Sequence, residues 1–167
     1  MSRKYILICV ALLISLFIYL FYRTNVTVVN EIFIRMLSLD TYIRLKAQIV
    51  QVLPLNDMVI YSLPEGLWIF CITLTSKPYY IRLYNRRIDC IFIPLIFCVG
   101  LEILQLFHIT NGRFDFMDIG VSVIFWILGG YILNDKPEKQ NILTRPNSKT
   151  IICLASYCIV YLAHVWK

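Results

Sequence analysis

The chain has 167 residues, of which 59% are hydrophobic and only 16% are charged, with a mean hydropathy of +0.72 and a formal net charge of +6. A water-soluble domain of this size is not expected, because so short a chain cannot bury so much apolar surface. A nucleic-acid-binding protein is not indicated either, since no basic face of a soluble fold is visible. The sequence favours one integral membrane domain over residues 1–167.

Five stretches are apolar enough, or nearly so, to form the membrane-spanning helices of about 20 residues that a bilayer requires. They are residues 5–22, 58–76, 90–107, 116–134 and 150–166. The first stretch follows a signal-like start, but its apolar run is long and lacks a small-residue cleavage site, so we expect it to persist as a helix. The predicted fold is an all-α, polytopic bundle of about five transmembrane helices.

Residues 23–57, between the first two stretches, combine apolar side chains at helical spacing with frequent charged residues. The charges are too frequent for a membrane crossing. We therefore expect one or two amphipathic helices that lie on the outer leaflet or cap the bundle, ending at Pro54. The later segment 135–149 is polar, contains two prolines and is expected to be a solvated connection.

The basic residues predict the orientation, because cytoplasmic loops carry the excess of Lys and Arg. With the N-terminus inside, most of the 16 basic residues fall in cytoplasmic segments, including the group Lys77, Arg82, Arg86 and Arg87. This group is expected to determine topology, and it also suits anionic lipid headgroups. We expect a cytoplasmic N-terminus and an external C-terminus.

Six cysteines lie inside or at the ends of the apolar stretches, and none forms a Cys-x-x-Cys pair. Such cysteines are typical of small buried hydrophobic residues. A disulfide framework, a zinc centre or another metal site is not expected, and no cofactor is predicted.

Polar residues collect in and between the third and fourth apolar stretches. Glu102 and Gln105 are three residues apart on one helical face, while Asp115 and Asp118 open the fourth stretch, with Ser122 one turn deeper. The short connection between the two stretches makes them antiparallel neighbours, so the polar faces are expected to come within reach of each other. Intramembrane acids are rare unless they face a partner, a cavity or a substrate.

Two further residues are candidates for the same cluster. Arg113 is placed to pair with Glu102 or Asp115. Glu65 follows Pro64 at the outer end of the second stretch, where it is either a further acid of the pocket or an ordinary first-turn acid. The predicted ligand-binding residues are Glu65, Glu102, Gln105, Arg113, Asp115 and Asp118, and no catalytic residue is assigned.

The motif Glu102-x-x-Gln105, followed by Gly112-Arg113-Phe-Asp115-Phe-Met-Asp118, resembles the signature of the VanZ-like family of small bacterial membrane proteins. The stretch Ser62-Leu-Pro-Glu-Gly-Leu-Trp68 also resembles the preceding helix in one branch of that family, so that the resemblance covers roughly residues 57–134. The chain departs from the pattern at Ser122, where Asn is usual, and at Phe125, where Gly is usual. The resemblance implies a bacterial plasma membrane and a family related to glycopeptide resistance, but no reaction.

Three functions remain open from the sequence. The first is a binding protein for an envelope lipid or a cell-wall precursor, which its outward-facing polar cluster would recognise. The second is a membrane enzyme that uses paired carboxylates, or a divalent cation held by them, on a lipid-linked substrate. The third is a structural protein with a membrane protein partner and no ligand, in which the cluster only fixes helix packing.

Overall fold

The computed structural model of the chain describes residues 3–23, 28–84, 86–109, 114–131, 138–143 and 147–165. Helices make up 77% of it, which agrees with the predicted all-α class. The elements in chain order are α1 (Arg3–Phe21), α2 (Val28–Leu37), α3 (Leu39–Val52), α4 (Asp57–Ser76), β1 (Tyr79–Leu83), β2 (Arg86–Asp89), the 3-10 helix η1 (Cys90–Phe92), α5 (Ile93–Leu106), α6 (Phe116–Tyr131), β3 (Gln140–Asn141) and α7 (Ser148–Val165).

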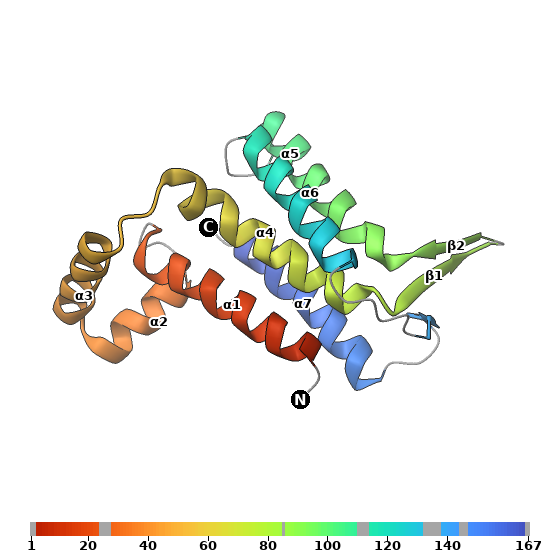
Figure 1. Cartoon of the computed structure of the whole chain (residues 1–167), viewed down its shortest axis with the longest axis horizontal. Coiled ribbons are helices and arrows are strands. Elements are labelled where there is room, and N and C mark those ends of the chain that lie inside the picture. The colour runs from red at the N-terminus through yellow and green to blue at the C-terminus, as the bar shows by residue number, and fades with distance from the viewer. Residues whose placement is uncertain are drawn as a thin grey trace.

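Helix α4 lies at the centre of the bundle, with α1 in front of it, α7 behind it and the pair α5 and α6 above it in the view of Figure 1. The helix begins after Asn56, whose side chain accepts a 2.9 Å hydrogen bond from the backbone N–H of Val59 and so caps the first turn. Residues Ile69–Ser76 are continuously buried. As the central helix, α4 brings its side chains next to several other helices.

Two glycines allow α4 and α6 to approach each other closely. A Cβ atom at Gly66 would lie 2.5 Å from the Phe125 side chain and 2.7 Å from that of Val121. A Cβ atom at Gly129, further along α6, would lie 3.1 Å from Cβ of Thr73. Larger residues at either position would separate the two helices, and Glu65 would move with them.

The predicted amphipathic segment forms the two helices α2 and α3. Its buried polar contacts tie both helices to the end of α1: Tyr42 donates its hydroxyl hydrogen to the Leu20 carbonyl oxygen (2.5 Å), and Asn30 Nδ2 donates to the Tyr42 hydroxyl (2.7 Å). Lys46 donates to the backbone oxygen of Arg23 (2.8 Å), and partial burial lowers the pKa of its ammonium group. These contacts hold the segment as a compact cap at one end of the bundle (Figure 1).

A three-stranded sheet is present that the sequence does not predict. Strands β1 and β2 form an antiparallel hairpin with Tyr80 opposite Asp89, and β3 pairs in parallel with β1, with Tyr79 opposite Gln140. Segment 135–149 is expected from the sequence to be a solvated connection; its described residues 138–143 are exposed or half-buried, and two of them form β3. Five consecutive residues with aromatic and β-branched members, Tyr79–Leu83, favour the strand conformation at this point.

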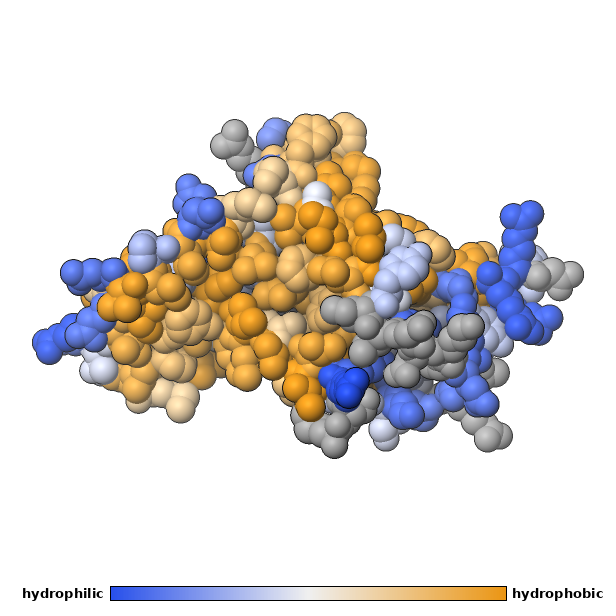
Figure 2. All heavy atoms as spheres, viewed as in Figure 1, coloured by the Kyte–Doolittle hydropathy of each residue, from blue (hydrophilic) through white to orange (hydrophobic). Residues whose placement is uncertain are grey.

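The structure does not confirm a bundle of five spans. Among the described residues, only α1 and α4 are long and apolar enough to cross a membrane. The helices Cys90–Leu106 and Phe116–Tyr131 are apolar but shorter. The expected end of the fourth span, residues 132–134, lies outside the described residues. The face shown in Figure 2 is apolar over the middle of the molecule, and hydrophilic side chains gather on it at two ends, near α2 and α3 and near the β-hairpin.

Candidate functional site

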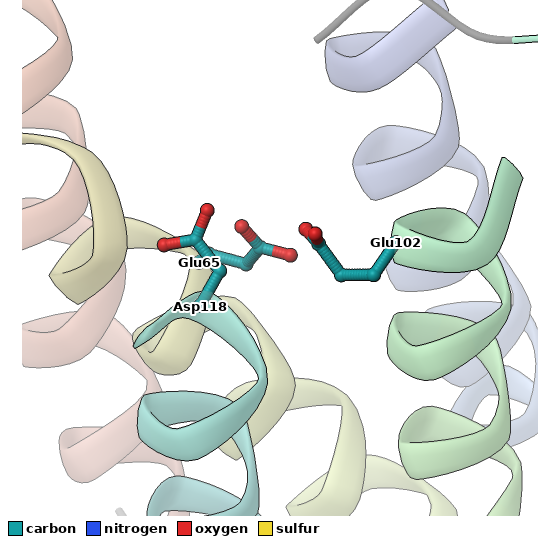
Figure 3. A group of neighbouring side chains, drawn as sticks. All are labelled: Glu65, Glu102 and Asp118. Carbon is teal, nitrogen blue, oxygen red and sulfur yellow. The ribbon is translucent and has the colours of Figure 1, made fainter. Parts of the chain in front are cut away.

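Three carboxylates from three different helices meet at the end of the bundle where α5 ends and α6 begins. One oxygen from each of Glu65, Glu102 and Asp118 lies within 4.8 Å of the others. Figure 3 shows Glu102, on α5, pointing toward Glu65 on α4 and Asp118 on α6. The antiparallel course of α5 and α6 and the central position of α4 produce this meeting, since each acid lies toward the same end of the bundle.

The three acids differ in burial and in hydrogen bonding. Glu102 is 1% exposed, and its Oε2 accepts a 3.0 Å hydrogen bond from the backbone N–H of Asp115. Glu65 and Asp118 are half-buried. Oδ1 of Asp118 is buried and has no hydrogen-bond partner within the described part of the chain. Glu102 is thus the most deeply buried of the three residues, while Glu65 and Asp118 are each partly exposed.

Cys98 and Ser122 lie beside the acids, one helical turn deeper in the bundle. Cys98 Sγ, one turn before Glu102 on α5, is 3.9 Å from Glu65 Oε1 and next to Ser122. Ser122, one turn beyond Asp118 on α6, is 0% exposed, and no described residue offers its Oγ a hydrogen bond of suitable geometry. A buried thiol and a buried hydroxyl therefore line the inner side of the cluster.

No described basic side chain forms an ion pair with these carboxylates. The ion pair between Lys139 and Asp89 lies beside the β-hairpin instead. Arg23 is close enough to Glu65 for their charges to interact. The acids therefore have little compensating charge, and ionised carboxylates are hydrogen-bond acceptors only, so they cannot bond to one another without a proton or a cation between them.

The Arg23 side chain donates hydrogen bonds to backbone carbonyl oxygens of α4 next to the cluster. Pro64 has no N–H, so the Ile60 carbonyl lacks its usual helical donor. The Arg23 side chain donates to this oxygen from Nε (3.5 Å) and to the Tyr61 carbonyl oxygen from Nη2 (2.7 Å). Its guanidinium also lies 4.6 Å from the centroid of the Tyr19 ring. Arg23 therefore stabilises the turn of α4 that precedes Pro64, and the position of Glu65 depends on that turn.

We expect the substitution Arg23→Gln to lower the free energy of unfolding by about 1–3 kcal/mol, because it leaves carbonyl oxygens of α4 without a charged donor. Thermal unfolding in mild detergent, followed by circular dichroism, measures the effect. The matched control is Arg35→Gln, at an exposed position of α2. Equal unfolding midpoints for the two variants would contradict this role for Arg23.

Of the remaining predicted residues, Asp115 and Gln105 are not among the three acids that meet. The Asp115 side chain is exposed and accepts a 2.8 Å hydrogen bond from the Met117 N–H, so that its carboxylate caps α6 while its own N–H binds Glu102. Gln105 is half-buried near the end of α5. The expected pairing of Arg113 lies outside the described residues. The sequence interpretation assigns no role to Arg23. Two features could have indicated its role: its position directly after an apolar helix, and the proline in α4 that leaves a carbonyl oxygen without a donor.

An apolar groove of about 190 Å³ lies between α4 and α6. Its walls come from the first turns of α4 and from the α6 face that includes Val121 next to Ser122. The lining side chains are Met58, Val59, Leu63, Val121, Ile124 and Phe125. An apolar groove and a carboxylate cluster thus share the same pair of helices.

Comparison of the chain with protein-family models, curated proteins and solved structures found no match. The resemblance to the VanZ-like family rests on the motif residues themselves. Two acids of that motif, Glu102 and Asp118, are members of the carboxylate cluster, and Glu65 comes from the preceding helix.

Proposed function

We propose that the chain is a multi-pass, VanZ-like protein of a bacterial plasma membrane, with α1, α4, η1–α5, α6 and α7 as its five membrane-spanning elements. The apolar surface between two hydrophilic ends supports this assignment (Figure 2). The spans that are shorter than usual require local thinning of the bilayer, which costs only fractions of a kcal/mol per Å.

The proposed orientation places the N-terminus in the cytoplasm and the C-terminus outside. Its support is the β-hairpin after α4, where Arg82, Arg86 and Arg87 are exposed, as expected for a cytoplasmic connection. The carboxylate cluster lies toward the opposite end of α4 from that hairpin. In this orientation the cluster faces the outer leaflet.

Within that setting, we propose that the protein binds an envelope lipid or a lipid-linked cell-wall precursor at the outer side of the membrane. The observation that carries this function is the meeting of Glu65, Glu102 and Asp118 from three helices without an ion-paired partner among the described residues. Ionisable residues inside a membrane usually mark a ligand or ion path. The polar head of an amphiphile would meet the acids, and its apolar part would meet the neighbouring groove.

The size of the groove limits what it can hold. Pockets for small molecules usually measure about 300–1,000 Å³, whereas this groove measures about 190 Å³. It therefore suits a segment of one lipid chain, with the rest of the chain in the bilayer. A purely structural role for the acids fits less well, because polar residues that join membrane helices do so by pairing donors with acceptors.

Native mass spectrometry of the protein in mild detergent, after incubation with a bacterial envelope lipid extract, tests this function. We expect the wild type to retain a lipid that the double variant Glu102→Gln/Asp118→Asn releases. The control is Asp40→Asn/Asp57→Asn, which removes two exposed carboxylates outside the cluster. Equal lipid retention by all three folded proteins would overturn the proposal.

A further inference from the structure

The carboxylate cluster has two features that call for an additional positively charged species. The first is its charge, because three carboxylates that share a volume less than 5 Å across repel one another unless that charge is compensated. The second is the fully buried Ser122 hydroxyl, which has only the weakly bonding Cys98 thiol beside it and makes no hydrogen bond of normal geometry within the described residues, together with the unpartnered Asp118 Oδ1. Buried polar atoms without partners are rare in native proteins, and each usually reflects a missing water, ion or ligand.

Ser122 is not one of the acids, but it lies on the same face of α6 as Asp118. It lies one turn from Asp118 on α6 and beside the Cys98 thiol, which itself contacts Glu65 Oε1. Its hydroxyl oxygen is a hard, neutral ligand of the kind that joins carboxylates around alkaline-earth ions. The three acids and this hydroxyl would therefore supply four oxygen ligands.

The charge of the cluster selects the type of cation. A monovalent amine would leave most of the charge of three ionised carboxylates uncompensated, whereas a divalent ion leaves about one negative charge. Four oxygen ligands beside a single thiol, that of Cys98, favour Ca²⁺, Mg²⁺ or Mn²⁺ over Zn²⁺, whose usual protein sites are built mainly from nitrogen and sulfur ligands.

The spacing of the oxygens then favours the largest of these ions. Two ligand atoms of one ion cannot be farther apart than twice the ion–oxygen distance, which is about 5.2 Å for Ca²⁺ and about 4.2 Å for Mg²⁺. The three carboxylate oxygens lie within 4.8 Å of one another, so any two of them can reach one Ca²⁺ ion. Three oxygens at that full spacing would lie about 2.8 Å from a central ion, so a contraction of a few tenths of an ångström brings all three to the Ca²⁺–oxygen distance. Mg²⁺, whose ligands lie at about 2.1 Å, requires a larger contraction of the cluster and also demands a regular octahedron.

We propose that Glu65, Glu102 and Asp118 bind one Ca²⁺ ion, with the Ser122 hydroxyl as a ligand on the inner side. Ca²⁺ takes about 6–8 oxygens, so positions remain open toward Glu65 and Asp118, the half-buried members of the cluster. This inference rests on the proposed function in one respect: the open positions would accept phosphate oxygens of the bound lipid. An acidic site would in this way bind an anionic headgroup.

The test uses the full chain, purified in mild detergent and treated with EDTA, and measures its thermal midpoint and its mass during titration with CaCl2 or MgCl2. We expect one Ca²⁺ per chain, a midpoint that rises with Ca²⁺, and an affinity for Mg²⁺ at least tenfold weaker. Asp118→Asn and Glu65→Gln should each weaken Ca²⁺ binding at least tenfold, whereas the exposed Asp57→Asn should bind as the wild type does. Two different variants are included so that failure of one to fold leaves the test intact.

Unchanged Ca²⁺ binding in both cluster variants, no binding by the wild type at millimolar Ca²⁺, or Mg²⁺ binding as tight as that of Ca²⁺ would overturn the inference. Lipid retention separates it from the proposed function. A lipid that is retained equally in EDTA and in Ca²⁺ would refute the cation and leave lipid binding intact. Stoichiometric Ca²⁺ with no lipid retained in either condition would establish the ion site and refute lipid binding.

Discussion

The substitution Gly66→Leu is expected to lower the free energy of unfolding by about 3 kcal/mol or more, since overpacking a close helix contact usually costs about 1–3 kcal/mol and leucine adds four carbons. The first of these atoms, Cβ, already lies 2.5 Å from the Phe125 side chain and 2.7 Å from Val121. Thermal or denaturant unfolding in detergent measures the loss. Because Glu65 is the preceding residue, the same change should also weaken ligand binding at the carboxylates.

Gly120→Leu is the matched control, because a Cβ atom at Gly120 has no neighbour within 4 Å. That substitution should be neutral or stabilising, since glycine costs a helix interior about 0.8–1.0 kcal/mol relative to alanine. The double variant Gly66→Ala/Phe125→Leu provides a rescue, because the atom that a Cβ at Gly66 meets first belongs to the Phe125 ring. If Gly66→Leu and Gly120→Leu unfold at the same midpoint, the close contact of α4 and α6 is not as described.

The contact between Gly66 and Phe125 also explains a departure in the sequence. Position 125 carries Phe where the resemblance to the VanZ-like family leads one to expect Gly. In the structure the required space comes from α4, where Gly66 faces the Phe125 ring. A single sequence shows each residue separately, and only the packed helices show that the small residue and the large one face each other.

The helices could be predicted from the sequence because a long apolar run bounded by polar residues has few alternative structures. The stretches 5–22, 58–76, 90–107 and 116–134 correspond to α1, α4, η1–α5 and α6. The meeting of Glu102 and Asp118 follows from the short connection between two antiparallel helices. The position of Glu65 depends instead on how α4 packs against that pair, which no local pattern specifies.

Two features escaped prediction for the same physical reason. The pairing of β3 with β1 joins Gln140 to Tyr79 across a long separation in sequence, and a strand of two residues has no periodicity to detect. Arg23 reaches the carbonyl oxygens of α4 from the end of α1, although its position in the sequence suggests only an interfacial charge. Both contacts are set by tertiary packing.

Removing charge from the carboxylate cluster is expected to stabilise the protein when divalent ions are absent. At an effective dielectric constant of about 20, two unit charges about 4.8 Å apart repel by about 3.5 kcal/mol, and 4.8 Å is the upper limit of the spacing here. Glu102→Gln/Asp118→Asn keeps the shape of both side chains, and the amide oxygen introduced at position 102 can still accept from the Asp115 N–H. We therefore expect the double variant in EDTA at pH 8 to be more stable than the wild type by about 2 kcal/mol, which is less than the full repulsion because the side chains can move apart.

For a chain of this length, that difference corresponds to a rise of about 4–8 °C in the thermal midpoint. Millimolar Ca²⁺ should reverse the order, because it stabilises only the protein whose three carboxylates are intact. The control Asp40→Asn/Asp57→Asn removes the same number of charges from exposed positions and should follow the wild type in both conditions. If the cluster variant is instead less stable than the wild type in EDTA, the acids hold the helices together through shared protons, and the structural role becomes the better interpretation.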